Sequence, residues 1–148
     1  MKRLLIATTA LFSTCFSAHA DMIVKPSSHS VPVTIDRLAA AVEKAGATVF
    51  ARIDHAAGAA KVDAKLAPNQ MLMFGNPKLG TPAMQASATM GMDLPLRVVA
   101  FEDPEGKVHI AYHDPADVAA LHGLPADHPV IAKMQGALSK LTGKAAGE

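Results

Sequence analysis

The stretch from Phe74 to Arg97, FGNPKLGTPAMQASATMGMDLPLR, decides how this chain is organised. It opens with the loop sequence GNPKLG at residues 75–80 and closes with DLPLR at residues 93–97. Glycine and proline are the strongest local breakers of regular backbone, so their density here predicts a loop of specified shape. Strand-like apolar runs flank the stretch at residues 70–74 and 94–102. We therefore expect a functional site of this protein to lie here.

Amphipathic helices are predicted on both sides of this central stretch. In each one the apolar residues recur at intervals of three, four and three, which places them on one helical face. They are Ile35, Leu38, Val42 and Ala45 in residues 30–46, and Ile131, Met134, Leu138 and Leu141 in residues 129–141. A shorter helix is predicted from an N-cap at Thr81, with Pro82 in its first turn, to Gly91. Another short helix is predicted over residues 115–121.

Strands are predicted from runs of apolar residues and from period-2 alternation. The predicted strands are residues 22–26, 47–54, 70–74, 94–102 and 107–113. In the second of them the alternation places Val49, Ala51 and Ile53 on one face. The resulting order, β-α-β-β-β-β-α with short extra helices, predicts an α+β fold in which two amphipathic helices cover an antiparallel sheet.

The first 20 residues have the layout of a secretory signal peptide. Lys2 and Arg3 form a basic start, residues 4–16 are apolar, and Ala18-His19-Ala20 matches a cleavage site. We predict that residues 1–20 are removed on export and that residues 21–148 form a single domain, periplasmic if the host is Gram-negative. Because the only cysteine is Cys15, the exported domain is expected to have neither a disulfide nor a thiolate metal site.

The charge balance argues against a nucleic-acid partner. The chain has 14 basic and 13 acidic residues, and loss of Lys2 and Arg3 leaves 12 against 13, a formal charge of −1. Binding to a phosphate backbone requires a basic surplus, so we expect no nucleic-acid partner. Beyond the signal region no stretch is long and apolar enough to cross a bilayer, so no membrane span is expected.

The loop at Gly75 partly imitates a phosphate-binding loop. The lysine that should follow Gly80 is missing, and Pro77 and Pro82 each remove a backbone donor. Nucleotide hydrolysis is therefore poorly supported. Two interpretations remain: Lys78 and a helix N-terminus at Thr81 hold a small anion or carboxylate, or the loop is a structural corner at a dimer interface.

Metal binding and acid–base catalysis are the alternatives. Thioethers favour Cu(I), so Met71, Met73, Met84 and His109 are the candidate ligands of a copper site. Methionine also fills irregular cores, and the composition favours that role, so neither a metal nor a cofactor is expected. An acid–base site would combine His55 with Asp93, with Arg97 as an electrostatic partner, although Asp93 is also a common turn former.

Four segments of the chain resemble a known bacterial family. They are RIDHAAGA at 52–59, FGNPKLGTPAMQA at 74–86, MDLPLRVVAFED at 92–103 and GKVHIAYHDP at 106–115. The family is called domain of unknown function 302, and the likeness runs from Ser30 to about Leu141. The resemblance implies a fold similar to that of the TATA-binding protein, usually as a homodimer, and no established activity. The fold analogy says nothing about DNA binding, because function depends on the site.

Together these observations favour an exported, non-catalytic homodimer that binds a small molecule, an anion or a partner. The expected ligand-binding residues are Asn76, Lys78, Thr81, Asp93, Arg97 and His55. Copper handling through methionine and histidine, and an enzyme with an acid–base site near His55 and Asp93, remain the alternatives.

Overall fold

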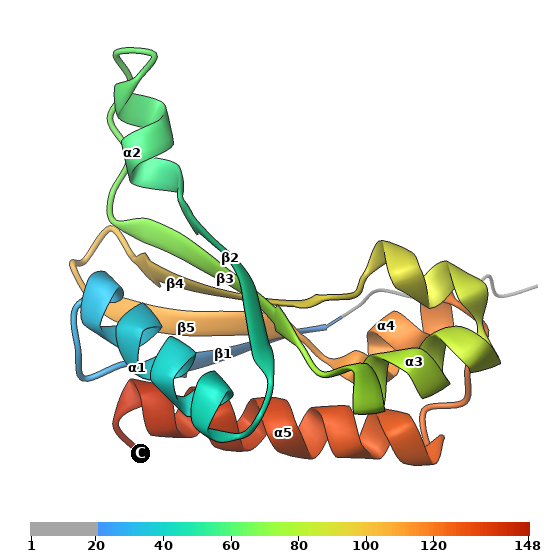
Figure 1. The fold of residues 1–148 in the computed structure, drawn as a ribbon. Helices are drawn as coiled ribbons and strands as arrows, with labels where there is room; N and C mark the ends of the chain where they lie inside the picture. Colours follow the sequence, from blue (N-terminus) through green and yellow to red (C-terminus); the bar gives the residue numbers. More distant parts are fainter. Residues whose placement is uncertain (1–20) are drawn as a thin grey trace, which may run out of the picture.

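The computed structural model describes residues 21–148, and the predicted signal peptide lies outside the described residues. Over this range the chain forms an antiparallel sheet in the order β1-β5-β4-β3-β2 (Figure 1). The strands are β1 (Met22–Pro26), β2 (Thr48–Asp54), β3 (Asn69–Gly75), β4 (Leu96–Glu102) and β5 (Val108–His113). The predicted α+β fold is confirmed.

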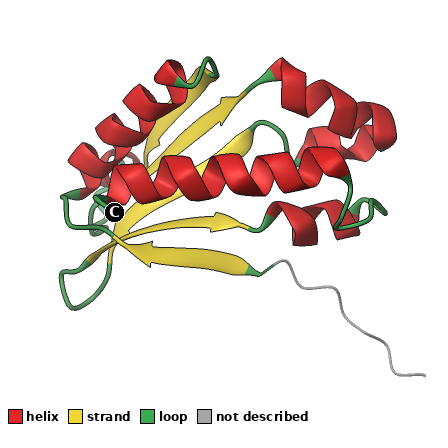
Figure 2. Cartoon of the chain, turned by 90° about the horizontal axis from the view of Figure 1, so that it is seen from below, coloured by secondary structure: helices red, strands yellow, loops and turns green. Residues whose placement is uncertain are grey.

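Two long helices, α1 (Val31–Lys44) and α5 (Pro129–Ala146), cover one face of the sheet (Figure 2). The remaining helical segments are α2 (His55–Ala60), α3 (Pro77–Ala86), the 3-10 segment η1 (Ala88–Met92) and α4 (Pro115–Leu121). We call the sheet face under α1 and α5 the helix face, and the opposite one the open face.

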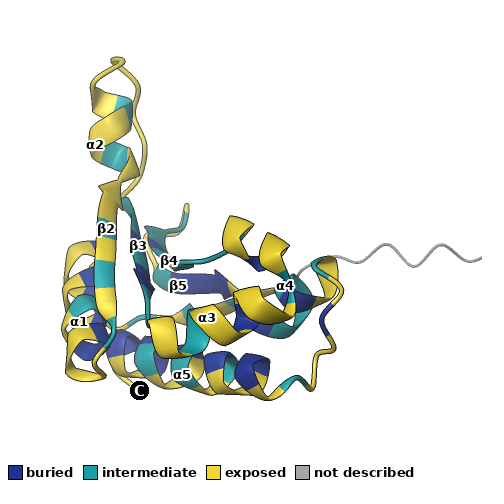
Figure 3. Cartoon of the chain, turned by 45° about the vertical axis from the view of Figure 1, so that its right-hand side comes forward, coloured by how far each residue is buried: buried dark blue, intermediate teal, exposed yellow. Residues whose placement is uncertain are grey.

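The core lies between the helix face and the two long helices (Figure 3). Its fully buried side chains include Leu72, Phe74, Val98 and Ile110 from the sheet and Ile35, Leu38, Val42 and Leu138 from the helices. A second buried cluster joins α3, η1 and α4 to the first half of α5, through Ala83, Met90, Ala119, Ile131 and Met134. The predicted apolar helix faces therefore pack, except at Ala45, which follows α1 as its C-cap and is exposed.

A β-bulge in β2 makes the predicted alternation of that strand wrong. Val49 pairs with Phe74, but the next paired residue is Ala51, opposite Met73, so the register shifts at Phe50. A bulge adds one residue to a strand and reverses the faces beyond it. Ala51 and Ile53 therefore face away from α1, and Arg52 takes the place on the helix face.

The helix predicted from Thr81 begins earlier. Asn76 is its N-cap, Pro77 is its first residue, and both Thr81 and Pro82 lie inside α3. Gly91, predicted as the end of this helix, lies inside η1. Pro77 suits the first helical position because its missing N–H would have no partner there. Residues 76–80, predicted as part of a loop, therefore supply the N-cap and first turn of α3.

An arm formed by residues 55–68 links β2 to β3 and projects away from α1 and α5 (Figure 1). None of the six residues of α2 is buried. Val62 and Leu66, in the return segment, are 74% and 49% exposed. The arm therefore presents apolar side chains without packing them in this chain.

The open face carries an apolar row that crosses the whole sheet. The paired residues Val24, Ala111, Val99, Met71 and Ile53 follow one another from β1 to β2. At the two edges of this row Val24 is 45% and Ile53 is 36% exposed. The exposed apolar side chains of the row therefore lie at its two ends, because Ala111 within it is 1% exposed.

Candidate functional site

The central stretch encloses a hollow of about 270 Å³, which we call the loop pocket. Its walls come from the end of β2–β3, from α3, from the start of β4 and from α5. They are Phe50, Gly75, Asn76, Pro77, Leu79, Gly80, Thr81, Met84, Leu94, Pro95, Leu96 and Met134. Ten of these twelve residues belong to the stretch that the sequence singled out, and most of them are apolar.

Asn76 shapes the loop pocket through its own hydrogen bonds. Its side-chain Oδ1 accepts the amide of Lys78 at 2.9 Å, and its Nδ2 donates to the carbonyl of Gly46 at 3.2 Å. The amides of Leu79 and Gly80 both donate to the carbonyl of Asn76. Since Pro77 has no N–H, the first turn of α3 keeps no free amide for an anion.

The other residues predicted around this loop divide into two groups. Thr81 lines the loop pocket from within α3. Lys78 lies exposed on the same helix and is not among the residues lining the hollow. The structure therefore places Asn76 and Thr81 together at one hollow and leaves Lys78 outside it.

Asp93 and Arg97 line a second hollow of about 460 Å³, the face groove, at the end of the open face. Its walls are Met22, Met71, Asp93, Arg97, Val99, Ala111, Tyr112, His113, Val118 and Leu121. A hollow of about 40 Å³ adjoins both sites, because it shares Leu94, Leu96 and Met134 with the loop pocket and Asp93, Arg97 and His113 with the face groove.

The carboxylate of Asp93 is held from two sides. Arg97 Nη2 donates to its Oδ1 at 2.6 Å, and His122 Nε2 lies 2.8 Å from its Oδ2. The other ring nitrogen of His122 lies 2.9 Å from the hydroxyl of Thr89. The His122 side chain is 8% exposed. This chain of contacts ties the end of α4 to η1 and to the start of β4.

His55 lies apart from Asp93. It begins α2 after Asp54, which pairs with Gln70 at the arm end of β3. Asp93 precedes β4, whose first residue, Leu96, pairs with Phe74 at the opposite end of β3. His55 and Asp93 therefore lie near opposite ends of β3. The neighbour of Asp93 is His122 instead.

The predicted copper ligands are also separated. Met71 and Met73 point to the open face of β3, whereas Met84 lines the loop pocket. His109 Nε2 lies 2.7 Å from Asp103 Oδ2, and its ring stacks on Phe101 with centroids 5.4 Å apart. Among residues 21–148, no three His, Cys, Asp or Glu side chains lie close enough together to hold a metal ion.

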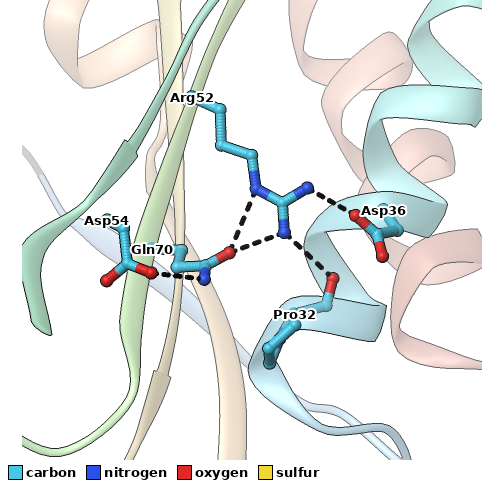
Figure 4. A network of polar contacts seen from close by, with 5 residues as sticks. All are labelled: Pro32, Asp36, Arg52, Asp54 and Gln70. Carbon is cyan, nitrogen blue, oxygen red and sulfur yellow. Dashed lines mark hydrogen bonds and ion pairs between the residues drawn. The ribbon is translucent and has the colours of Figure 1, made fainter. Parts of the chain in front are cut away.

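The other end of the β2–β3 pair is filled by a polar network (Figure 4). Arg52 bonds Gln70 Oε1 through Nε and Nη2 at 3.1 and 2.7 Å, and it also pairs with Asp36 on α1. Gln70 Nε2 donates to Asp54 Oδ2 at 2.9 Å. Asp54 Oδ1 in turn accepts the amide of Ala57, which caps α2.

The network holds Asp54 in its charged form. The hydrogen bond from the Ala57 amide is the main reason why the pKa of Asp54 lies below its ordinary value, and the bond from Gln70 adds to it. Desolvation acts in the opposite direction. A carboxylate that accepts such bonds is favoured over the neutral acid. The base of the arm is thus fixed to α1 through charged and hydrogen-bonded groups.

Two residues of these sites escaped sequence reasoning. Phe50 lies at the bulge of β2 and lines the loop pocket, and its only signal was an aromatic residue on a predicted strand. His122 meets Asp93 although the two are 29 residues apart, and its position before Gly123 indicated only a helix end. Long-range pairs of this kind leave no periodic trace in the sequence.

The chain belongs to the family described as domain of unknown function DUF302, whose model matches residues 23–141. A crystal structure of an uncharacterised conserved DUF302 protein from Bacillus stearothermophilus has the same fold, with a TM-score of 0.76 at 18% sequence identity. The match covers 84% of this chain and 97% of the other. This likeness confirms the fold, and the match over residues 23–141 confirms the family.

Relatives with a functional name occur in Brucella. A protein of Brucella suis named fluoride-specific ion channel FluC 1 is 42% identical over 129 residues, which cover 86% of this chain and 50% of the relative. A Brucella melitensis protein named FluC 2 is also 42% identical, over 47% of its length. The chain thus spans about half the length of these relatives. Within the described range, no helix combines the length and apolar character needed to cross a bilayer.

Proposed function

We propose that this protein is an exported, non-catalytic binding domain that acts as a homodimer and holds a small ligand in the loop pocket. The observation that carries the proposal is the pocket itself. Its walls converge from four parts of the fold, and most of them are apolar side chains. Concave, largely apolar hollows with few polar groups are the usual form of small-ligand sites.

A fragment titration tests the ligand-binding part. The purified, ¹⁵N-labelled protein is titrated with a chemically mixed set of small fragments, both charged and uncharged, and amide shifts are followed. We expect shifts that cluster at Phe50, Gly75 and Gly80. A set in which no fragment moves these amides overturns the proposal.

The homodimer is supported by the apolar row of the open face and by the arm. A two-fold dimer buries the same patch on both copies, which suits a row that runs across the whole sheet. Val24 and Ile53 lie at the exposed edges of this row, and Val62 and Leu66 extend the apolar surface along the arm. A second copy on the open face would cover these side chains.

Light scattering coupled to size-exclusion chromatography tests the assembly. We expect the mass of a dimer for the wild type and of a monomer for the double variant Val24→Glu with Ile53→Glu. Val33→Glu is the matched control, because Val33 is 43% exposed on α1, on the other side of the sheet. A monomeric wild type, or a double variant that stays dimeric, contradicts this assembly.

Export rests on the sequence of residues 1–20. Fusion of these residues to a reporter that is active only in the periplasm tests it. Activity that disappears when Lys2, Arg3 and the cleavage site are changed together supports export. A reporter that stays in the cytoplasm contradicts it.

A second candidate function is action beside a fluoride-transporting membrane protein. It is favoured by relatives that are named fluoride-specific ion channels and of which this domain matches about half. Deletion of the gene would then lower the fluoride concentration that stops growth, and a plasmid copy would restore it. Unchanged fluoride tolerance argues against this role.

A further inference from the structure

We propose that Gly75 and Gly80 set the size of the loop pocket and make it selective for a small, uncharged apolar ligand, such as a short unbranched alkyl chain. This inference deepens the proposed ligand-binding function and rests on it. It names the chemistry of the ligand and the residues that determine specificity.

The two glycines are not required by the backbone. The described glycines with positive φ are Gly46, Gly106, Gly123 and Gly147. Gly75 is the last residue of β3, and Gly80 lies inside α3. Glycine in such positions destabilises a strand or a helix relative to alanine. Gly58, Gly136 and Gly143 lie inside helices in the same way, but Gly75 and Gly80 are the ones that line the loop pocket.

A methyl group at either position would enter the loop pocket. At Gly75 it would lie 3.4 Å from a ring carbon of Phe50 and 3.7 Å from Cβ of Pro95. At Gly80 it would lie 3.9 Å from both Leu94 Cδ1 and Met84 Cε. All four neighbours are pocket walls. The missing side chains therefore leave room in the pocket, and alanine at Gly80 fits without a clash.

The bulge at Phe50 independently points to the same hollow. Phe50 is 57% exposed, yet its ring is held against the Gly75 position and lines the pocket. Bulges are frequent beside functional sites. Here the bulge reverses the faces of Ala51, Arg52 and Ile53 and leaves Phe50 at the pocket. A strand glycine, a helix glycine and a bulge thus depart from local sequence rules around one hollow. Such departures concentrate at functional sites.

The walls specify an apolar ligand. No Asp, Glu, Lys, Arg or His lines the loop pocket, and the amide of Asn76 is already bonded to Lys78 and Gly46. The hydroxyl of Thr81 is the remaining polar side-chain group of the lining. A charged group would lose its hydration there and gain no partner of opposite charge. The volume of about 270 Å³ lies below the roughly 300–1,000 Å³ of sites for drug-sized ligands, so a smaller molecule is expected.

A series of 1-alkanols from butanol to decanol tests the inference on the purified, ¹⁵N-labelled protein. We expect affinity to rise about fourfold per methylene until the pocket is full, with octanoate weaker than octanol. Gly75→Ala and Gly80→Ala should each weaken octanol about fourfold, because each methyl takes the room of about one methylene. Gly136→Ala is the control, since a methyl there has no neighbour within 4 Å.

Circular dichroism and a heat-unfolding curve verify that each variant is folded. If Gly75→Ala does not fold, the test uses Gly80→Ala alone. Octanol affinity unchanged by Gly80→Ala, or octanoate binding as tightly as octanol, overturns the inference. If the mixed fragments bind at this pocket and the alkanols do not, the inference is overturned, but the proposed binding function is not. A pocket that no molecule enters overturns both.

Discussion

The β2–β3 strand pair ends in two different ways. At the arm end, Arg52, Gln70 and Asp54 lie on the helix face and satisfy one another and α1 through hydrogen bonds and an ion pair. At the loop end, Phe50 and Gly75 enclose an apolar hollow instead. One end is filled by paired polar groups, and the other is kept open.

This contrast separates what stabilises the fold from what offers a site. Paired polar groups hold the arm in place, because separating them would leave donors and acceptors without hydrogen bonds, which costs free energy. The atoms that line an apolar hollow lack the van der Waals contacts that filled space would give them. The loop end therefore leaves unfilled the space in which we propose the binding site.

The buried phenylalanine at the loop end, Phe74, provides the largest expected effect. Phe74 is 2% exposed within the core, so Phe74→Ala should lower the free energy of unfolding by about 3–5 kcal/mol. Urea unfolding followed by circular dichroism measures it. A loss below about 1 kcal/mol would mean that the hollow extends into the core and would remove the contrast between core and pocket.

The second largest effect on the free energy of unfolding is expected from Arg52, the cation at the centre of the arm-end network. Arg52→Met should lower the free energy of unfolding by about 1–2 kcal/mol, because Gln70 and Asp36 both lose a charged donor that is itself partly exposed. Lys61→Met, an exposed position in the arm, is the control. A double-mutant cycle with Asp36→Asn should show coupling, and strict additivity would contradict a shared network.

Acid should weaken the arm end before the loop end. The pKa of Asp54 is below its ordinary value in the folded protein, so its bonds stabilise the fold above the unfolded-state pKa. This contribution is lost as the pH falls through the lower, folded-state pKa. Unfolding midpoints measured from about pH 6 to about pH 2 should therefore fall less steeply for Asp54→Asn than for the wild type. Parallel curves would contradict this role.

The smallest effect is expected at the exposed phenylalanine. Phe50→Ala should change stability by no more than about 0.5 kcal/mol, since the side chain is 57% exposed. It should nevertheless weaken alkanol binding, because the ring forms a pocket wall. Titration of Phe50→Ala beside the wild type measures this. Strong destabilisation with unchanged binding would show that Phe50 belongs to the core.

Local patterns were sufficient to predict most of the fold. The intervals of apolar residues placed Ile35, Leu38 and Leu138 on the faces that pack. The order of strands and helices followed from the same patterns, whereas the family resemblance rested on four sequence segments, and both are confirmed. Periodicity reports burial directly, because a side chain's direction repeats with the backbone.

Features that depend on pairing between distant segments could not be predicted. The bulge at Phe50 depends on how β2 meets β3, and it moved Arg52 to the face predicted for Ala51. The helix α3 starts after Asn76 and not after Thr81, although both residues precede a proline. The Asp93–His122 contact joins elements 29 residues apart. These are the features that shape the candidate sites.

Paired measurements on Gly80→Ala test the central claim, that the loop end sacrifices stability to keep a pocket open. We predict that Gly80→Ala raises the free energy of unfolding by about 0.5–1 kcal/mol and weakens octanol binding about fourfold. A variant that is less stable than the wild type, or that binds octanol equally well, would contradict it.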